Sequence, residues 1–334
     1  MAQENRAIAS PQTSLNRAQG DDLPAPATRP LPLVETATET PLETVSAAIF
    51  VSSKPNSSSP IPRQKPVSYR PRLPRFARAK QSHRPPLALQ DRDLQLLRIV
   101  SGYRLISTPQ VLRLFEDESR DGIYRRLQGL FHHGYLDRLG TNPNAPLVYA
   151  LGQRGADVLG VTRRKPVSDP YVDHQLMIGD FRIAMTRATA ARNIVFSWRS
   201  VPADSPVKPD GFFGLQFLDR PEGKNRAFFF LEADRSTMTR ERYVQKLVNY
   251  GRWYQGGGHT EKLGIKRFRV LTVTKSEERA RSLLEAATRC SELDSALPMF
   301  WFASEARFAG SASVVDPVWH VPGAASELRG LLPG

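Results

Sequence analysis

Residues 227–234, Ala-Phe-Phe-Phe-Leu-Glu-Ala-Asp, constrain the fold of this chain more than any other segment. The run from Ala227 to Leu231 is apolar without alternation, which is typical of a strand buried on both faces in the interior of a sheet. Such a strand needs helices packed on both sides of the sheet. It ends in two carboxylates, Glu232 and Asp234, which are candidates for chemistry at the strand end.

The segments around this strand predict an open mixed sheet with flanking helices. In chain order the pattern reads helix, three strands, helix, strand, helix. The strands are expected near 194–198, 211–217, 227–234 and 267–274, and the helices near 171–192, 239–255 and 276–290. We therefore expect an α/β domain over residues 170–310, followed by a C-terminal tail over residues 311–334.

A second pattern, over residues 87–165, is typical of a winged helix-turn-helix domain. Three short helices are expected near 91–101, 109–115 and 122–133. In the third, Ile123, Leu127 and Leu130 repeat at helical spacing and define the buried stripe. Two short apolar runs joined by turn residues then predict a β-hairpin, and a helix over 152–159 closes the domain. The expected fold class is α+β with two domains.

Charge points to nucleic acid as the partner. The chain carries 47 Lys and Arg against 33 Asp and Glu, a net charge of +14, and such an excess attracts polyanions. In a winged helix the third helix enters the major groove while the hairpin reaches the neighbouring backbone. The residues expected to contact double-stranded DNA are Arg120, Arg125, Arg126, Arg138 and Arg154. The alternatives are a solvated helix face and a winged helix that binds protein.

Residues 1–86 are rich in Pro, Ser, Thr and Ala and are expected to form a disordered tail, because such a segment buries too little apolar surface to fold. Its last part, from Ile61 to Arg84, is a basic arm with eight Lys or Arg and no acidic residue. The arm either lies along DNA phosphates or serves as a solubilising linker, and the two readings carry equal weight.

Composition excludes several classes of protein. With Cys290 as the single cysteine, an intrachain disulfide and a multi-cysteine zinc site are excluded. No apolar run approaches the roughly 18–20 residues of a membrane span, and the N-terminus lacks the apolar core of a signal peptide. We expect a cytoplasmic protein without a membrane partner. A second copy of the chain and replication or mobilisation proteins are further candidate partners.

Three carboxylates of the α/β domain form a candidate catalytic site. Asp210 begins one strand, whereas Glu232 and Asp234 end the next, and positions i and i+2 of a strand share a face. Hard oxygen ligands of this kind suit Mg²⁺ or Mn²⁺, which could activate a nucleophile. The alternative is that Glu232 and Asp234 cap the strand end and pair with Arg235 or Arg240.

Other polar side chains of the domain receive supporting roles. Lys246, on the following helix, offers a positive charge to the three carboxylates. His174 has no second histidine at ligand spacing, so a packing or hydrogen-bonding role is favoured over catalysis. Tyr243, Tyr250 and Tyr254 recur along one helix, and this spacing favours the core over a nucleophile.

Two blocks resemble the PD-(D/E)xK restriction-endonuclease-like superfamily, namely Val207-Lys-Pro-Asp-Gly and Phe229-Phe-Leu-Glu-Ala-Asp-Arg-Ser-Thr. The resemblance implies a nuclease-like fold in which Asp210, Glu232 and Asp234 hold the metal ion and Lys246 gives electrostatic support. The chain departs from the superfamily pattern at Asp234, where a lysine is expected.

The order of parts over residues 88–310 is similar to the replication-relaxation family of plasmid and mobile-element proteins. Further blocks that carry the likeness are His174-Gln-Leu-Met-Ile-Gly-Asp180, Lys246-Leu-Val-Asn-Tyr250, Val270-Leu-Thr-Val-Thr and Ser276-Glu-Glu-Arg279. The resemblance implies a role in plasmid replication or DNA relaxation, and some members resemble C-class mobilisation relaxases, which nick DNA.

Two alternatives therefore stay open. One is a metal-dependent nickase at a plasmid origin, with the three carboxylates and Lys246 as its site, and their presence together favours it. The other is a non-catalytic DNA-binding replication initiator or transcriptional regulator with a degenerate nuclease-like domain. The lysine missing at position 234 favours this second alternative.

Overall fold

The computed structural model describes residues 77–78, 86–139, 144–165, 169–309, 313–324 and 327–332, with the side chains of the helix at 169–190 described from residue 171 on. The disordered tail and the basic arm predicted for residues 1–86 lie outside these ranges, except for residues 77, 78 and 86.

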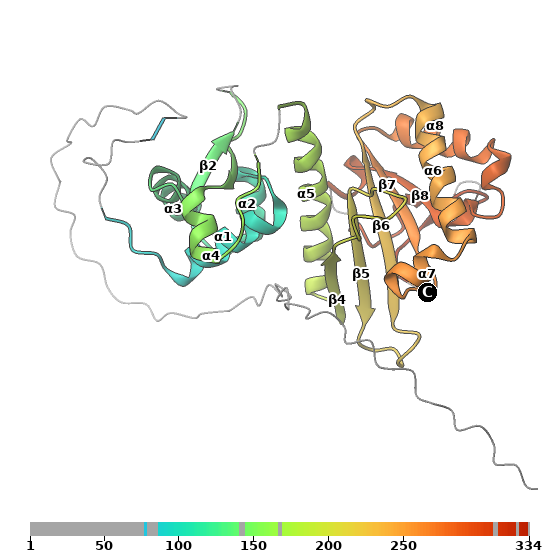
Figure 1. The fold of residues 1–334 in the computed structure, drawn as a ribbon, viewed down its shortest axis with the longest axis horizontal. Helices are drawn as coiled ribbons and strands as arrows, with labels where there is room; N and C mark the ends of the chain where they lie inside the picture. The colour runs from blue at the N-terminus through green and yellow to red at the C-terminus, as the bar shows by residue number, and fades with distance from the viewer. Residues whose placement is uncertain are drawn as a thin grey trace, which may run out of the picture. The chain divides into compact units, whose positions relative to one another are not determined.

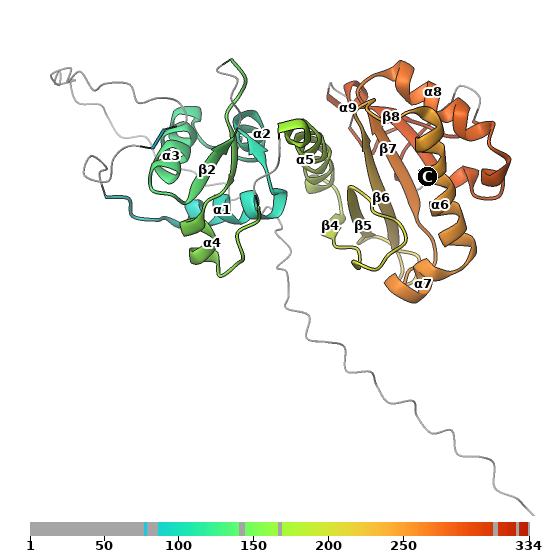
Figure 2. The ribbon, with the colours of Figure 1, turned by 45° about the horizontal axis from the view of Figure 1, so that its top comes forward.

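Residues 87–165 form a helix–hairpin module. Its elements are α1 (Asp91–Tyr103), β1 (Ile106–Ser107), α2 (Thr108–Leu114), α3 (Arg120–His132), β2 (Leu136–Leu139), β3 (Val148–Leu151) and α4 (Gln153–Leu159). The strands form an antiparallel sheet in the order β1-β3-β2 (Figure 1, Figure 2). The predicted succession of three helices, hairpin and closing helix is confirmed. The sequence did not indicate β1, because two residues carry no periodicity.

Serines begin two helices of this module. Ser107 and Gln110 form a reciprocal capping box at the start of α2, and the Ser119 hydroxyl caps α3. The stripe of Ile123, Leu127 and Leu130 predicted for α3 is buried in the core of the module. The opposite side of α3 is thereby left to solvent.

The rest of the chain is built on a seven-stranded mixed sheet. Its strands are β4 (Ile194–Arg199), β5 (Gly211–Phe217), β6 (Arg226–Asp234), β7 (Arg269–Thr274), β8 (Phe300–Ser304), β9 (Trp319–His320) and β10 (Leu328–Arg329). They lie in the order β10-β9-β8-β7-β6-β5-β4, and the pairs β6–β7 and β7–β8 are parallel whereas the others are antiparallel. The apolar segment 227–234 is therefore an interior strand, as predicted, and the structure is α+β.

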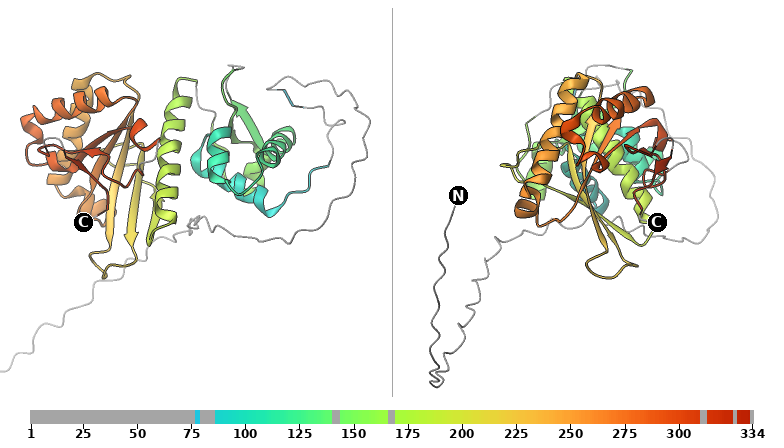
Figure 3. Two further views of the ribbon diagram at one scale, coloured as in Figure 1. Left: turned by 180° about the vertical axis from the view of Figure 1, so that it is seen from behind. Right: turned by 90° about the vertical axis from the view of Figure 1, so that its right-hand side faces the viewer.

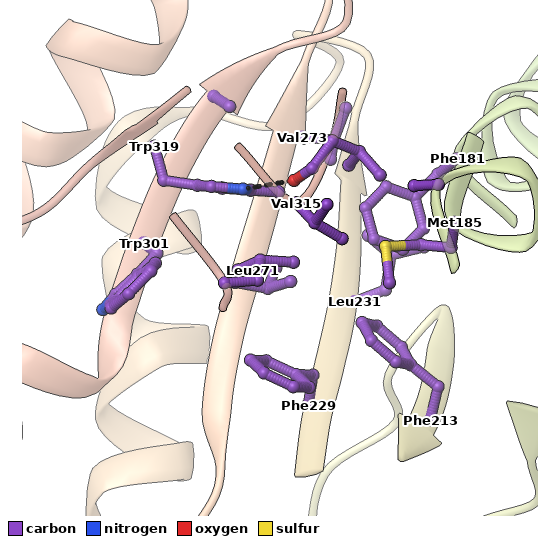
Figure 4. Close-up of a cluster of buried hydrophobic side chains, with 14 of the residues drawn as sticks. Phe181, Met185, Phe213, Phe229, Leu231, Leu271, Val273, Trp301, Val315 and Trp319 are labelled. Atoms are coloured by element: carbon purple, nitrogen blue, oxygen red, sulfur yellow. Dashed lines mark hydrogen bonds between the residues drawn. The ribbon is translucent and has the colours of Figure 1, made fainter. Parts of the chain in front are cut away.

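Helices cover both faces of this sheet (Figure 1, Figure 3). On one face α5 (Asp169–Ala190) packs through Phe181 and Met185 against Phe213, Leu231 and Trp319, a cluster drawn in Figure 4. On the other face α6 (Arg240–Gln255) and α8 (Glu277–Thr288) enclose a second apolar cluster. The remaining helical elements are α7 (Gly258–Leu263), α9 (Ala306–Ala309) and two 3₁₀ turns at Ser291–Leu293 and Leu297–Met299.

Part of the segment predicted as a C-terminal tail belongs to the sheet, since β9 and β10 extend it beyond β8. Trp319 of β9 is fully buried, and its indole N–H donates to the carbonyl of Val314 at 2.9 Å (Figure 4). Burying an indole of this size contributes on the order of 2 kcal/mol or more. The strands are only two residues long, so a periodicity search overlooks them.

Two further features bear on the exclusions made from composition. Cys290, just after α8, is a free, half-buried thiol. Within the described ranges, no helix combines the length and the apolar character needed to cross a membrane.

Candidate functional site

Asp210 lies at the end of β6 because of the strand register. β5 pairs with β6 so that Gly211 is opposite Leu231, which places Asp210 beside the last residues of β6. The Asp210 N–H donates to the Leu231 carbonyl at 3.0 Å, and its Oδ2 accepts from the Ala233 N–H at 2.9 Å. These bonds fix the side chain at the point where the predicted carboxylates were expected to meet.

Glu232 is the most buried of the three predicted carboxylates, with a side chain 1% exposed. Alternation along β6 turns Leu231 toward α5 and Glu232 toward α6. There Glu232 accepts from the Lys246 ammonium, and its Oε1 accepts from the Tyr250 hydroxyl at 2.5 Å. Lys246 and Tyr250 are one helical turn apart, so α6 presents both to the same carboxylate.

The pKa of Glu232 is raised from 4.5 to about 8. Burial is the main cause, because it disfavours the charged form, and the negative charge of Asp210 adds to it. Lys246 and the Tyr250 hydroxyl act in the opposite direction. Glu232 is therefore a carboxyl group able to hold or release a proton near neutral pH, which is the property expected of a general acid or base.

His174 reaches this group from α5. Its Nε2 lies 2.9 Å from Asp210 Oδ1, and this hydrogen bond is the main cause that raises the pKa of His174, with burial opposing it. The hydrogen-bonding role favoured for His174 is thus the contact observed. His174, Asp210, Glu232, Lys246 and Tyr250 together are called the Glu232 cluster below.

Two tyrosines of α6, Tyr250 and Tyr243, are held as neutral phenols. Burial raises the pKa of Tyr250 well above 10.0, and the neighbouring Glu232 adds to the effect. Tyr243 is fully enclosed, with its hydroxyl 2.8 Å from Thr272 Oγ1, and burial raises its pKa in the same way. Tyr254 stacks on His259 with ring centres 4.8 Å apart. Neither Tyr243 nor Tyr250 is set up as a phenolate nucleophile.

Asp234 is held by α8. Its Oδ2 accepts from Arg279 Nε at 2.7 Å, and the same guanidinium donates to the Met238 carbonyl at 2.6 Å. The partner is therefore neither Arg235 nor Arg240, the two candidates considered from sequence. Arg235 instead pairs with Asp173 at 2.8 Å.

As arranged, the three carboxylates do not fit a divalent cation. Glu232 has an ammonium against it and Asp234 a guanidinium, and these fixed positive charges repel a second cation. Among the described residues, no three His, Cys, Asp or Glu side chains come together as a possible metal site. The Mg²⁺ or Mn²⁺ ion expected from the sequence stays a prediction.

The outer face of α3 carries two of the five predicted DNA-contacting arginines. Arg120 and Arg125 are exposed, and Arg125 makes a single long bond, 3.3 Å, to the carbonyl of Asp121. Tyr124 between them is 44% exposed, which is unusual for so large an apolar group. This face combines two exposed cations with an exposed aromatic ring.

Arg126 of α3 has a different role from Arg125. It forms an ion pair with Asp93 of α1, whose side chain is 1% exposed, and it reaches the Ala88 carbonyl. The pair joins α1 to α3 inside the module.

The two arginines expected near the hairpin also pack within the module. The guanidinium of Arg138 lies 4.1 Å from the centre of the Phe131 ring. Arg154 lies 4.7 Å from the centre of the Tyr135 ring and donates to the His133 carbonyl at 3.1 Å. Stacked guanidinium groups of this kind hold helix and hairpin together.

Two partners of the carboxylates were not assigned from sequence, although a signal for each was present. Tyr250 stands four residues after Lys246, so a helix that directs Lys246 to Glu232 also directs Tyr250 there. Arg279 occurs in the quoted block that begins at Ser276, but only the fold brings it to Asp234.

Comparison with known proteins gives a single family. The model of the replication-relaxation family matches residues 97–267, more than half of the 334 residues. This span includes both α3 and the Glu232 cluster. No curated protein and no solved structure matches the chain.

Proposed function

Because this chain belongs to the replication-relaxation family, we propose that it acts in replication or mobilisation of a plasmid or other mobile element. It does so by binding a specific duplex DNA site through the helix–hairpin module, which functions as a winged helix. The order of elements from α5 through β4, β5, β6 and α6 to β7 supports a nuclease-derived origin for the second domain. This domain supports binding and does not cut DNA.

The observation that carries DNA binding is the division of α3 into two faces. Its inner stripe is buried, whereas Arg120, Tyr124 and Arg125 project on the outer side. A helix held in this way can lie in a major groove, with arginines donating to guanine edges or phosphates. The net charge of +14 supports the same partner, because it raises the local concentration of DNA.

A non-cutting role is supported by the state of the carboxylates. Lys246 and Tyr250 occupy Glu232, and Arg279 occupies Asp234. A nuclease of the PD-(D/E)xK type would need the carboxylate oxygens of Glu232 and Asp234 to bind a metal ion. Here these carboxyl groups instead make internal polar contacts that join the sheet to its helices.

The binding experiment measures fluorescence anisotropy of the full chain with duplexes that tile the replicon carrying its gene, at several salt concentrations. We expect one duplex to bind more tightly than the others. Arg120→Ala with Arg125→Ala should weaken binding and make the salt dependence shallower by about two units, because two phosphate or base contacts are lost.

A matched control removes two exposed arginines, Arg281 in α8 and Arg289 directly after it, which are 62% and 77% exposed. This variant loses the same charge but should keep the affinity and salt dependence of the unmodified chain. Equal binding by both double variants and the unmodified chain would remove α3 from the interface, and absence of any preferred duplex would contradict specific binding.

A second candidate function, strand nicking, is favoured by one observation. Lys246 reaches Glu232 from α6, so a lysine does lie beside the acidic strand end although position 234 is an aspartate. Together with a Glu232 pKa of about 8, this supplies a group for proton transfer.

The two candidates differ in one assay. Supercoiled plasmid carrying the bound duplex is incubated with the chain and Mn²⁺, and with Asp210→Ala and Glu232→Ala variants. If the protein only binds, no relaxed product forms beyond the level of either variant. Relaxed product that disappears in both variants, and persists in the Arg281→Ala/Arg289→Ala control, would establish nicking.

A further inference from the structure

The helix–hairpin module contains a basic cavity that the proposed function does not use. Its volume is about 280 Å³, enough for a phosphate group and bound water. Six cationic side chains line it, against one carboxylate, Asp137. The six are Arg78, Arg104, Arg138, Arg163, Arg164 and Lys165.

The carboxylate does not balance this charge. Arg78 and Arg163 both pair with Asp137, the latter at 2.7 Å. Arg78 also donates to the carbonyls of Phe131 and Leu136, each at 2.9 Å. One residue of the segment predicted to be a basic arm is thus held against α3 and β2, with its guanidinium at the cavity.

Three other cations of the lining remain exposed. Arg104, Arg164 and Lys165 are exposed, and none forms an ion pair with another described residue. Arg104 ends α1 with a φ of 67°, a strained conformation for a residue with a Cβ, and such strain is found mainly at functional positions. The cavity therefore presents positive charge from α1 and from the segment after α4.

Part of the cavity lining is apolar. Phe131 and Leu139 contribute apolar surface, and the Arg138 guanidinium is stacked on the Phe131 ring. Cations next to apolar surface bind an anion more strongly than the same cations in open water, because the local dielectric is lower.

We propose that this cavity binds a backbone phosphate of the same duplex that α3 contacts. The proposal rests on DNA binding by the module. β2 lines the cavity, so the hairpin expected to follow the DNA backbone leads directly to it. Phe131 lies eleven residues after Arg120, about 16 Å along the axis of α3, so the cavity lies at the far end of this helix from Arg120. The cavity thus extends the contacted DNA beyond the bases that α3 reads.

The test compares duplexes that end at the α3 site with duplexes extended by about one helical turn. The variant is Arg104→Gln with Arg164→Gln and Lys165→Gln, in the full chain. A matched control removes three exposed cations of the other domain, through Lys224→Gln, Lys266→Gln and Arg267→Gln. Affinity is measured against salt concentration for each.

We expect the cavity variant to bind the extended duplex with a salt dependence about one unit shallower than the unmodified chain, because one phosphate contact is lost, and to bind the short duplex almost normally. The control should behave as the unmodified chain on both. Arg120→Ala with Arg125→Ala should weaken binding to both duplexes.

Three outcomes would overturn parts of this account. A cavity variant equal to the unmodified chain on the extended duplex rejects the cavity as a DNA contact, while DNA binding itself stands. Inorganic phosphate or AMP that binds the chain and not the variant, with the DNA salt dependence unchanged, would assign the cavity to a small phosphate ligand instead. Absence of DNA binding by the unmodified chain rejects the proposed function together with the cavity contact.

Discussion

Lys246 of α6 and Glu232 of β6 form an ion pair at the buried end of the strand that organises the sheet. Glu232 is 1% exposed and Lys246 27% exposed, so the carboxylate is enclosed whereas the ammonium keeps some water. The negative charge of Asp210 acts on Glu232, and the Tyr250 hydroxyl donates a hydrogen bond to Glu232. The raised pKa of Glu232 gives two predictions.

The free energy of unfolding of the part of the chain built on the seven-stranded sheet, called the sheet domain below, should fall as pH rises through the neutral range. Unfolded, Glu232 ionises near 4.5, whereas folded it ionises near 8, so between these values the unfolded chain binds fewer protons. The free energy of unfolding therefore decreases with pH in this window. Glu232→Gln cannot ionise and should lack this component, a difference on the order of 2–4 kcal/mol between pH 5 and pH 8.

Urea unfolding followed by tryptophan fluorescence measures this difference, since all four tryptophans, Trp198, Trp253, Trp301 and Trp319, lie in the sheet domain. The unmodified chain and Glu232→Gln are compared at each pH, so other titrating groups cancel. Parallel stability curves for the two proteins would contradict a raised Glu232 pKa.

Lys246→Met should raise the pKa of Glu232 further. The ammonium favours the charged carboxylate, and methionine keeps the apolar stem without the charge. Carbon NMR of the Glu232 carboxyl over a pH series measures the shift. Lys262→Met, which removes an ammonium paired with the exposed Asp204, serves as the control and should leave the Glu232 titration unchanged. A Glu232 titration unaltered by Lys246→Met would mean that Lys246 does not affect the pKa of Glu232 in solution.

The candidate site was partly predictable from sequence. Asp210 begins one strand and Glu232 ends the next, so antiparallel pairing of these two strands places the two residues side by side. Lys246 could be placed near them from helical spacing. Asp234 could not, because its partner Arg279 is 45 positions away and meets it only when α8 packs on the sheet. Long-range ion pairs leave no local pattern in the sequence.

The same limit explains the arginines of the module. Arg125 and Arg126 are adjacent on α3, but helical spacing places Arg126 beside the buried stripe of Ile123 and Leu127 and Arg125 on the side away from it. The exposure of Arg125 follows from this spacing, whereas only the packing of α1 decides that Arg126 meets Asp93. The helices and hairpin themselves were predictable, since caps and apolar periods are local.

Arg126→Ala should destabilise the module far more than Arg125→Ala. Without Arg126, the Asp93 carboxylate is buried with no cation, at a cost of about 3 kcal/mol, whereas loss of the exposed Arg125 changes stability by less than about 0.5 kcal/mol. Hydrogen exchange of peptides from α1 and α3, in the full chain, measures this. In Asp93→Asn with Arg126→Ala, most of the protection should return. Equal exchange in the two single variants would show that the ion pair is not buried in solution.

Gly155→Ala should loosen the contact between α4 and β2. A Cβ at Gly155 would lie 2.3 Å from the Tyr135 carbonyl oxygen, a backbone atom that also accepts from the Gly152 N–H. The clash moves α4 outward, and we expect a loss of about 1–3 kcal/mol although alanine favours helix. Gly129→Ala in α3 is the matched control, since its Cβ would meet Leu87 only at 3.4 Å. That variant should be neutral or stabilised by up to about 1 kcal/mol.

Hydrogen exchange of the α4 and β2 amides separates the two substitutions, because faster exchange at these elements is expected for Gly155→Ala alone. The informative result is whether each substitution speeds or slows exchange. Helix propensity acts in favour of alanine at both positions, so only the close approach of Tyr135 to Gly155 can make one substitution harmful and the other not. Slower exchange in both variants would mean that α4 does not lie against β2 as closely as this contact requires.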